Sequence, residues 1–259
     1  MTLKHSFHGR TLGTLAATGQ DVYHKDYQPL PEGFLYAAAG DRAELEQLVT
    51  AHKCAAIMFE AVQGEGGVMP IGQEYADALR EVAEKYDLLL IADEVQLGNG
   101  RSGHLYGYME YGLQPDIVTT AKGLGGGLPI GATMFGTRVA EVFRPGDHGS
   151  TFGGNPTCCA GSVNILSRID DKLLAGVRER SDYLFRTLSG KKGIKSVTGM
   201  GLMLGLEVEK PAREFAELAL QKGVLVTTAK QKIRLLPALN IPMELLETAA
   251  QRLIECAAE

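Results

Sequence analysis

Lys122 and Asp93 are the two residues whose types and positions best suit covalent chemistry. Lys122 follows an apolar, strand-like run at residues 116–120 and opens the glycine-rich segment 123–127. Asp93 comes directly after the apolar run 88–92. A lysine amine can hold an aldehyde as a Schiff base, and an ionised aspartate can keep a pyridine nitrogen protonated. The pair therefore predicts pyridoxal phosphate chemistry.

Each of these residues also has an ordinary explanation when it is taken alone. Asp93 could cap the turn that follows it, and Lys122 could be a solvated surface lysine. Their joint placement favours the catalytic interpretation, because the carboxyl ends of parallel strands meet at one edge of a sheet. Lys122 must be neutral to attack an aldehyde, so we expect burial and neighbouring positive charge to lower its pKa.

Two other patterns suggest ligands and are less persuasive. Residues 98–103 match the glycine spacing GxGxxG after a strand. The dinucleotide fingerprint also needs an apolar helix straight afterwards and an acid at the end of the next strand, whereas Asp116 begins that strand. His5 and His8 have HxxH spacing without a further ligand, so we interpret them as surface or structural histidines.

Three charged residues could recognise a substrate. Glu65 stands in the glycine-rich segment 63–67, where the simpler reading is a plain turn. Arg10 and Arg234 are single arginines in glycine-containing or apolar settings. Each arginine could form a structural ion pair, but a dicarboxylate substrate would need such bidentate cations.

Composition limits the function classes. The 259 residues are 45% hydrophobic and 22% charged, which is ordinary for a globular protein of one or two domains. The net charge of -5 and the lack of a basic run argue against nucleic acid as a partner. No apolar stretch reaches membrane-spanning length, and the first residues lack the apolar core of a signal peptide. Four cysteines without a CxxC pair argue against a disulfide framework or zinc site and suit a reducing cytoplasm.

Strand-like and helix-like segments alternate in the first part of the chain, which predicts an α/β fold with a mainly parallel sheet. The expected helices are 41–53, begun by an Asp41–Glu44 capping box, and 75–86; the expected strands are 54–60, 88–92, 116–120 and 130–135. After Pro156 the pattern predicts a smaller α+β domain. Its expected helices are 158–169, 172–188, 214–222 and 243–256, and its expected strands are 197–209, 224–227 and 233–236. We therefore expect a large domain over residues 1–160 and a small domain over 161–259.

Five segments, in order along essentially the whole chain, resemble the class III (ornithine-type) aminotransferases, which are fold-type I pyridoxal phosphate enzymes. These segments are residues 6–11 (SFHGRT), 63–68 (QGEGGV), 93–96 (DEVQ), 121–122 (AK) and 148–156 (HGSTFGGNP). Within the class, residues 199–205 and 233–237 are most similar to the branch that acts on N-acetylornithine.

The resemblance implies a set of contacts to pyridoxal 5'-phosphate. Lys122 would carry the cofactor and Asp93 would pair with its pyridine nitrogen. Gln96 would form a hydrogen bond with the ring hydroxyl. Phe7 would stack on one face of the ring, and Val95 would cover the other.

The resemblance also implies contacts to substrates and to a second subunit. Thr151 would reach the cofactor phosphate of the neighbouring subunit, which makes the active unit a homodimer, and the adjacent Ser150 would contribute to substrate binding. Arg10 would hold the α-carboxylate of the amino donor. Arg234 would hold the α-carboxylate of 2-oxoglutarate, and Glu65 would mask Arg234 while a donor binds by its distal amine.

The chain departs from the family pattern at three places. Ala61 and Leu97 replace residues that are usually proline and a small or hydroxylated residue. The family also has a long segment before residues 6–11, which includes a phosphate cup at a helix amino terminus. The resemblance therefore implies a truncated member with an incomplete large domain, weak cofactor binding and instability or inactivity as a monomer.

Three functions remain open at this point. The first is transfer of the distal amino group of N-acetylornithine to 2-oxoglutarate in arginine biosynthesis. The second is the same reaction with ornithine, succinylornithine or another ω-amine. The third is a catalytically inactive chain that only associates with a partner subunit.

Overall fold

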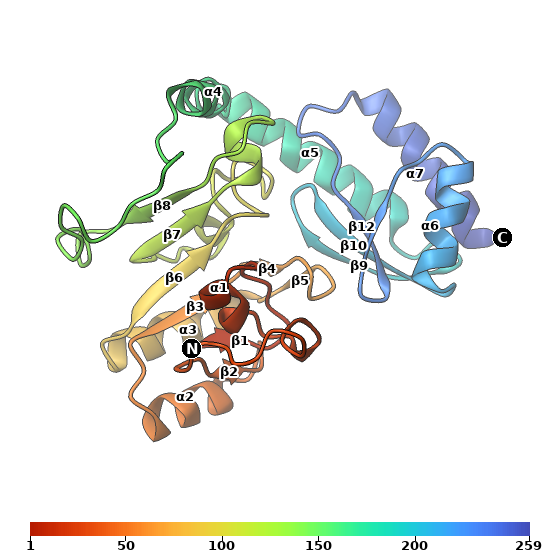
Figure 1. Ribbon diagram of the computed structural model, residues 1–259. Coiled ribbons are helices and arrows are strands. Elements are labelled where there is room, and N and C mark those ends of the chain that lie inside the picture. The colour runs from red at the N-terminus through yellow and green to blue at the C-terminus, as the bar shows by residue number, and fades with distance from the viewer.

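A four-stranded sheet forms the centre of the amino-terminal lobe in the computed structural model, which describes residues 1–259 (Figure 1). The sheet has the order β3-β6-β7-β8. Its strands are β3 (Ala56–Phe59), β6 (Leu89–Asp93), β7 (Ile117–Thr120) and β8 (Ala132–Phe135). The first three strands are parallel, and β8 is antiparallel to β7. The prediction of a mainly parallel α/β sheet is therefore confirmed.

Two helices cover this sheet. The helix α3 (Gln73–Lys85) packs on β3 and β6, and it buries the apolar face expected from its spacing, including Leu79 and Val82. The helix α2 (Arg42–Ala51) packs against α3. Its predicted capping box forms only in part. Asp41 accepts the Glu44 N–H at 2.9 Å, but the Glu44 carboxylate bonds to other groups outside the helix.

Short elements that the sequence did not predict surround the amino terminus. The strand β1 (Thr2–Leu3) pairs in parallel with β2 (Tyr36–Ala37), and between them lie the helix α1 (Leu12–Ala17) and the 3-10 turn η1 (Asp21–Tyr23). Further along the chain, β4 (Val62–Gln63) and β5 (Met69–Pro70) form a hairpin around the glycine-rich segment. A second 3-10 turn, η2 (Gly107–Tyr111), follows β6.

The carboxyl-terminal lobe is an antiparallel sheet covered by helices (Figure 1). The sheet has the order β11-β12-β10-β9, with β9 (Ile194–Met200), β10 (Met203–Val208), β11 (Thr227–Ala229) and β12 (Lys232–Leu235). The helices are α5 (Asp171–Leu188), α6 (Ala212–Gln221) and α7 (Met243–Ala258). The expected strand 197–209 is thus a hairpin of two strands, because Gly201 turns the chain at a φ of 56°. The strand expected at 224–227 begins at Thr227, because the Val224 N–H instead closes the end of α6 on the Ala219 carbonyl.

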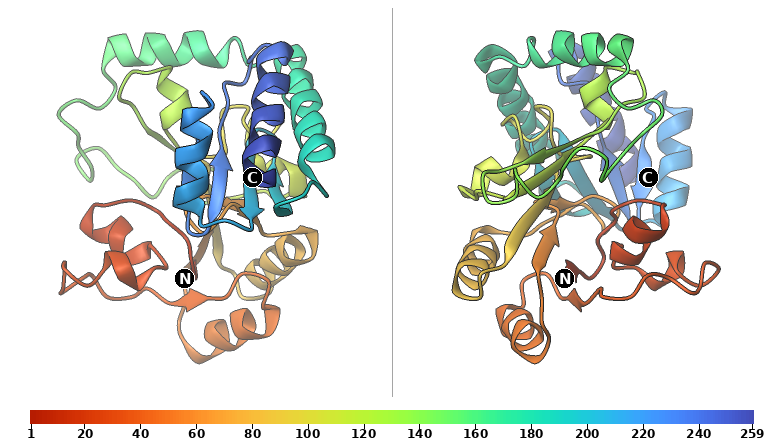
Figure 2. Two further views of the ribbon diagram at one scale, coloured as in Figure 1. Left: turned by 90° about the vertical axis from the view of Figure 1, so that its right-hand side faces the viewer. Right: turned by 60° about the vertical axis from the view of Figure 1, so that its left-hand side comes forward.

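Two apolar clusters, of 25 and 18 buried residues, form the cores of the lobes, and the first cluster also includes Met203 and Ala229 of the carboxyl-terminal lobe. The helix α4 (Pro156–Leu166) leads from the first lobe towards α5, as two further views show (Figure 2). The expected domain boundary near residue 160 falls inside α4. No helix of the structure is both long and apolar enough to cross a lipid bilayer.

The loop of residues 98–103 joins the two lobes. The Arg101 guanidinium donates to the Leu202 and Pro237 carbonyls at 2.8 and 3.0 Å, and Arg178 donates to the Gly103 carbonyl. The glycine-rich loop with GxGxxG spacing therefore forms a contact between the two lobes. Gly201 takes part in this contact, since a Cβ there would lie 2.1 Å from the Arg101 carbonyl oxygen.

Gly201→Ala should destabilise the chain far more than Gly190→Ala. Both glycines have positive φ, so each alanine meets backbone strain of about 1 kcal/mol. A Cβ at residue 190 meets nothing within 4 Å, whereas the Cβ at residue 201 collides with the Arg101 backbone. We expect an additional loss of about 2 kcal/mol in the free energy of unfolding for Gly201→Ala, measured by urea denaturation. Equal losses in the two variants would contradict this account of the lobe contact.

Candidate functional site

Lys122 begins the 3-10 turn η3 (Lys122–Gly125), just beyond the carboxyl end of β7. Its φ of 45° places it in the left-handed region, which is uncommon for a residue with a side chain. Asn99 fixes the backbone before it, because its Nδ2 donates to Thr120 Oγ1 at 2.9 Å and to the Ala121 carbonyl at 3.2 Å. The lysine is therefore held in an unusual backbone conformation at the end of a central strand.

The surroundings of Lys122 lower the pKa of its amine. The residue as a whole is exposed, yet enough protein surrounds its ammonium that desolvation lowers this pKa. The carboxylates of Asp93, Glu65 and Glu60 act on this pKa in the opposite direction, and Arg234 adds to the lowering. Lys122 thus lies within electrostatic reach of two residues that sequence reasoning assigned to substrate, Glu65 and Arg234.

Asp93 is the buried end of β6, and three donors surround its carboxylate. Oδ2 lies 2.7 Å from His8 Nδ1, and Oδ1 accepts from the Val95 N–H at 3.1 Å and from Thr119 Oγ1 at 3.3 Å. An ionised carboxylate offers about four acceptor positions, so these partners leave room for one more donor. Asp93 can therefore still bind a protonated ring nitrogen.

His8 and Glu60 belong to this site although the sequence did not identify them as site residues. His8 is buried on Asp93, and its Nε2 has no hydrogen-bond partner. Glu60 follows β3 and is buried beside both. Burial, and then Asp93, raises the pKa of Glu60 to about 7 against the opposing effect of His8. The sequence signals for His8 are its HxxH spacing with His5, which predicts surface or structural histidines, and its place in the motif at residues 6–11; the structure buries it.

Gln96, Glu65 and Arg234 form a second cluster. Arg234 Nη1 donates to Glu65 Oε1 at 2.5 Å and to Gln96 Oε1 at 3.0 Å. Gly64 makes this arrangement possible, because a Cβ there would lie 2.4 Å from Gln96 Nε2. The structure thus brings together Glu65 and Arg234, which are 169 residues apart in the sequence.

Phe7 and Arg10 lie on the loop that carries His8. The Phe7 ring packs edge-on against Tyr23 with centroids 5.4 Å apart. The Arg10 guanidinium lies 4.7 Å from the Tyr23 ring centroid and 5.5 Å from that of Phe7. Arg10 has no carboxylate partner within the chain. Its guanidinium is therefore free to bind an anionic ligand.

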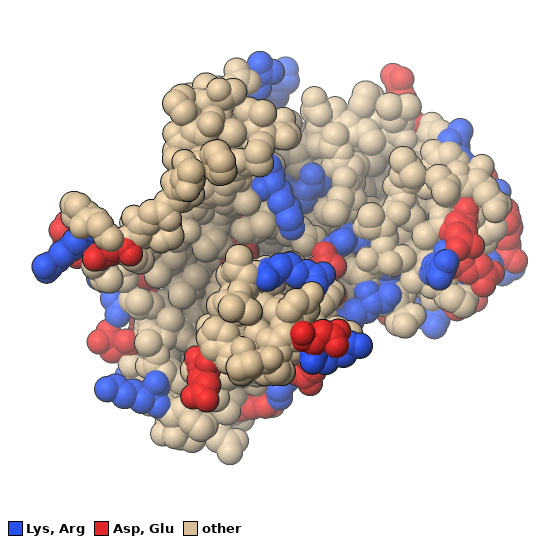
Figure 3. All heavy atoms as spheres, viewed as in Figure 1, with Lys and Arg blue, Asp and Glu red and all other residues tan.

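Ser150 and Thr151 do not join these clusters within one chain. Both are exposed in the loop between β8 and α4, and neither side chain forms a hydrogen bond in the chain. The space-filling view shows the amino-terminal lobe hollowed between the part next to α4 and the part that bears α1, with basic side chains along the hollow (Figure 3).

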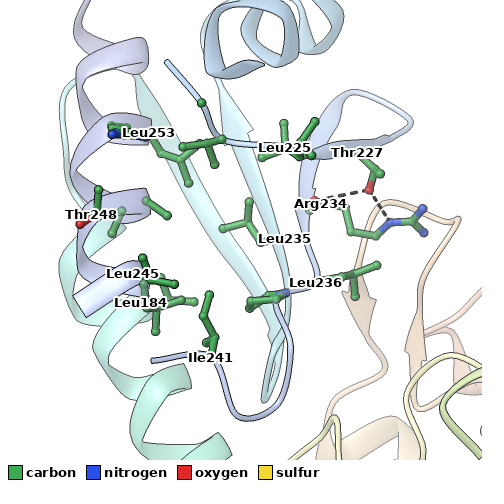
Figure 4. A pocket seen from close by; sticks show the side chains of 18 residues that line it. Leu184, Leu225, Thr227, Arg234, Leu235, Leu236, Ile241, Leu245, Thr248 and Leu253 are labelled. Atoms are coloured by element: carbon green, nitrogen blue, oxygen red, sulfur yellow. Dashed lines mark hydrogen bonds between the residues drawn. The ribbon is translucent and has the colours of Figure 1, made fainter. Parts of the chain in front are cut away.

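A mainly apolar cavity lies beside the carboxyl-terminal sheet. It has a volume of about 540 Å³ and is lined by the segment before β11, by β12 and by α7, including Leu225, Leu236 and Leu253 (Figure 4). Leu235 and Arg234 both line this cavity, and the Arg234 guanidinium extends from its border to Glu65. Arg234 therefore borders both the cavity and the cluster that it forms with Glu65 and Gln96.

The residues at this site fit pyridoxal phosphate. Asp93 has an acceptor position to spare, and His8 supports it from the buried side. Gln96 has an Nε2 group that donates to nothing in the chain. Lys122 has a lowered pKa, as a nucleophilic amine requires.

Comparison with known proteins agrees with this chemistry. Residues 1–257 match the family model described as aminotransferase class-III. The acetylornithine aminotransferase of Haemophilus ducreyi is 42% identical over 261 residues, which are 100% of this chain and 66% of that protein. The succinylornithine transaminase of Salmonella newport is 43% identical over 262 residues, 97% of this chain and 64% of that protein. The chain thus spans about two thirds of the length of these relatives.

Solved structures show the same fold. The ornithine aminotransferase of Toxoplasma gondii ME49 has a TM-score of 0.93 at 29% identity, covering 99% of this chain and 63% of that one. The N-acetylornithine aminotransferase of Stenotrophomonas maltophilia K279a has a TM-score of 0.82 at 33% identity, covering 99% and 65%. By sequence and by fold, the chain belongs to the class-III aminotransferases, a pyridoxal phosphate-dependent family.

Proposed function

We propose that this chain is the main part of a transaminase that moves the distal amino group of N-acetylornithine to 2-oxoglutarate, in cytoplasmic arginine biosynthesis. The observation that carries the proposal is the Glu65–Arg234 ion pair beside Lys122, together with an Arg10 that lacks an acidic partner. In such a site Arg234 is already paired with an acid, and Arg10 is open to a substrate carboxylate. That arrangement suits two substrates that present their amino or keto group from opposite ends.

Pyridoxal phosphate, when bound, supplies an electron sink that stabilises negative charge on the substrate carbon. Lys122 would hold the cofactor and move a proton at its Nζ, which a lowered pKa favours because more of the amine is neutral. Asp93, supported by His8, would keep the ring nitrogen charged. Gln96 would donate from Nε2 to the ring oxygen, while Phe7 and Val95 would cover the two ring faces.

The two arginines would separate the two half-reactions. When the donor enters by its distal amine, Arg10 would bind its α-carboxylate and Glu65 would keep Arg234 neutralised. When 2-oxoglutarate enters, Glu65 would release Arg234, which would then bind the keto acid's α-carboxylate in a bidentate manner. The same site could thus accept both substrates, each with its reacting amino or keto group towards Lys122.

Ornithine, succinylornithine and other ω-amines are the alternative donors. Relatives of similar identity carry the names acetylornithine aminotransferase and succinylornithine transaminase, and a close fold neighbour is named ornithine aminotransferase. Arg10 and the Glu65–Arg234 pair would serve each of these donors, since all carry an α-carboxylate remote from the distal amine.

A second role, association with another subunit, is favoured by exposed apolar surface. All four residues of β8 are exposed, and this strand lies at the edge of its sheet. Phe143 and Phe152 in the following loop are also exposed. Apolar surface of this kind is typical of a protein interface. We propose that a second copy of the chain covers it and that Thr151 and Ser150 then reach the partner's site.

Covalent capture tests the role of Lys122. Incubation with pyridoxal phosphate and reduction with borohydride should place a pyridoxyl group on Lys122, and labelling should persist below the ordinary pKa of lysine because burial lowers its pKa. Lys230 is the matched control, since it also has positive φ and a pKa lowered by burial. Peptide mapping should find the label in Lys230→Ala and lose it in Lys122→Ala. A label mainly on Lys230 would reject the assignment.

Donor preference tests the Glu65–Arg234 pair. Glu65→Ala should leave Arg234 unmasked, so the kcat/KM for glutamate should rise relative to that for N-acetylornithine. A charge-assisted hydrogen bond contributes about 1.5–3 kcal/mol, which corresponds to a change of about tenfold or more in the ratio. Glu65→Gln retains an acceptor without the charge and should give a smaller change. An unaltered ratio in Glu65→Ala would argue against the switch.

Sedimentation tests the proposed dimer. Phe152 is 84% exposed in the loop after β8, and Leu225 is 86% exposed in the carboxyl-terminal lobe. Phe152→Ser should weaken self-association about tenfold, whereas Leu225→Ser should leave it unchanged. Analytical ultracentrifugation over a concentration series measures both dissociation constants. A monomeric parent chain, or equal effects of the two substitutions, would refute the proposed interface.

A further inference from the structure

Glu60 links two loops that are far apart in the sequence. It is fully buried directly after β3 and has no role in the chemistry described above. Its Oε1 accepts the Phe7 N–H at 2.9 Å, and its Oε2 accepts the Gly64 N–H at 3.1 Å. One carboxylate therefore holds the backbone of both loops, with one oxygen for each.

The two loops carry different parts of donor recognition. The first, residues 6–11, bears Phe7 and Arg10, and the second, residues 63–67, bears Glu65. A further hydrogen bond joins the second loop to the segment before the first one: Gln63 Nε2 donates to the Lys4 carbonyl at 2.9 Å. The Glu60 carboxylate thus connects the backbone of the loop that carries Arg10 to the backbone of the loop that carries Glu65.

The charge of Glu60 depends on its neighbours. His8 and Asp93 face it from the first loop and from β6, and Lys122 lies within electrostatic reach from η3. Burial is the main cause that raises the pKa of Glu60 to about 7, and the two N–H donors and His8 oppose this rise. A carboxylate can accept both N–H groups at once, whereas a protonated or amide side chain presents a donor of its own to one of them.

We propose that Glu60 is a positioning residue that couples the Arg10 loop to the Glu65 loop and thereby sets the preference between distal-amine and α-amine donors. This inference rests on the proposed function of the site. Release of the Glu65 loop would loosen the ion pair and free Arg234 for glutamate. Release of the Arg10 loop would weaken the grip on the donor that enters by its distal amine. Arg10 could also hold the second carboxylate of glutamate, so the expected shift towards glutamate comes from release of the Glu65 loop.

Glu94 provides a matched control. It is buried, its pKa is also raised by burial to about 7, and its carboxylate likewise accepts two backbone N–H groups, those of Gly107 and Tyr108, at 2.8 and 2.9 Å. The segment that it holds carries none of the residues proposed to bind a substrate. Glu60→Gln and Glu94→Gln therefore remove the same kind of interaction from different loops.

The first measurement needs neither cofactor nor activity. Amide hydrogen exchange of the cofactor-free chain should rise about tenfold or more at Phe7 or Gly64, and around the loop so released, in Glu60→Gln. In Glu94→Gln the rise should be confined to Gly107 and Tyr108. Unchanged exchange at both Phe7 and Gly64 in Glu60→Gln would overturn the link between the loops.

The second measurement is the donor ratio in the active enzyme. Glu60→Gln should shift the ratio of kcat/KM values towards glutamate by about fivefold relative to N-acetylornithine, and Glu94→Gln should not shift it. A faster exchange with an unshifted ratio would overturn the proposed effect on donor preference and leave the transaminase assignment standing. If the parent chain transfers no amino group from any donor, the proposed function fails, and the donor-preference role of Glu60 fails with it. The exchange data would still decide whether Glu60 couples the loops.

Discussion

The parallel pairing of β6 with β7 is the interaction on which the site depends. It places Asp93 opposite Thr119, so that the Thr119 hydroxyl reaches the aspartate and the chain turns into Lys122 shortly afterwards. A shift of one residue in this register would turn Asp93 towards the other face of the sheet. The remaining parts of the site, from the His8 loop to the Arg234 strand, are arranged around the edge that this pairing defines.

The cluster beneath that edge is costly to bury. Asp93, Glu60, Glu94 and His8 are all removed from solvent, and two of the acids have pKa values raised by burial. Backbone N–H groups and one imidazole offset part of the cost, since each carboxylate accepts at least two hydrogen bonds. The three carboxylates accept backbone N–H groups that lie outside the four-stranded sheet, so their burial fixes the segments around the site.

Many helices and strands could be predicted from the sequence, because apolar runs and amphipathic spacing are patterns of neighbouring residues. The strands of the first lobe and its helix α3 lie within a few residues of their expected positions. Local patterns failed where the chain reverses tightly, as at Gly201, and where two-residue strands form only by pairing with distant segments, as in β1 and β2.

The site was predictable in part. Lys122 and Asp93 stood out from their own positions after apolar runs, whereas the Glu65–Arg234 pair followed from resemblance to a family and has the expected geometry. Their roles in catalysis stay predictions. His8 and Glu60 could not be found from spacing, because their partners come from remote segments and only tertiary packing brings them together.

The ion pair between Glu65 and Arg234 also crosses from one lobe to the other, since Glu65 lies in the β4–β5 hairpin and Arg234 in β12. A ligand carboxylate that replaces Glu65 as the partner of Arg234 would take over one of several bonds between the lobes, beside those of Arg101 and Arg178. The occupant of the site would then be part of the joint between the two lobes. The contact between the lobes would then change each time Arg234 exchanges Glu65 for a substrate carboxylate.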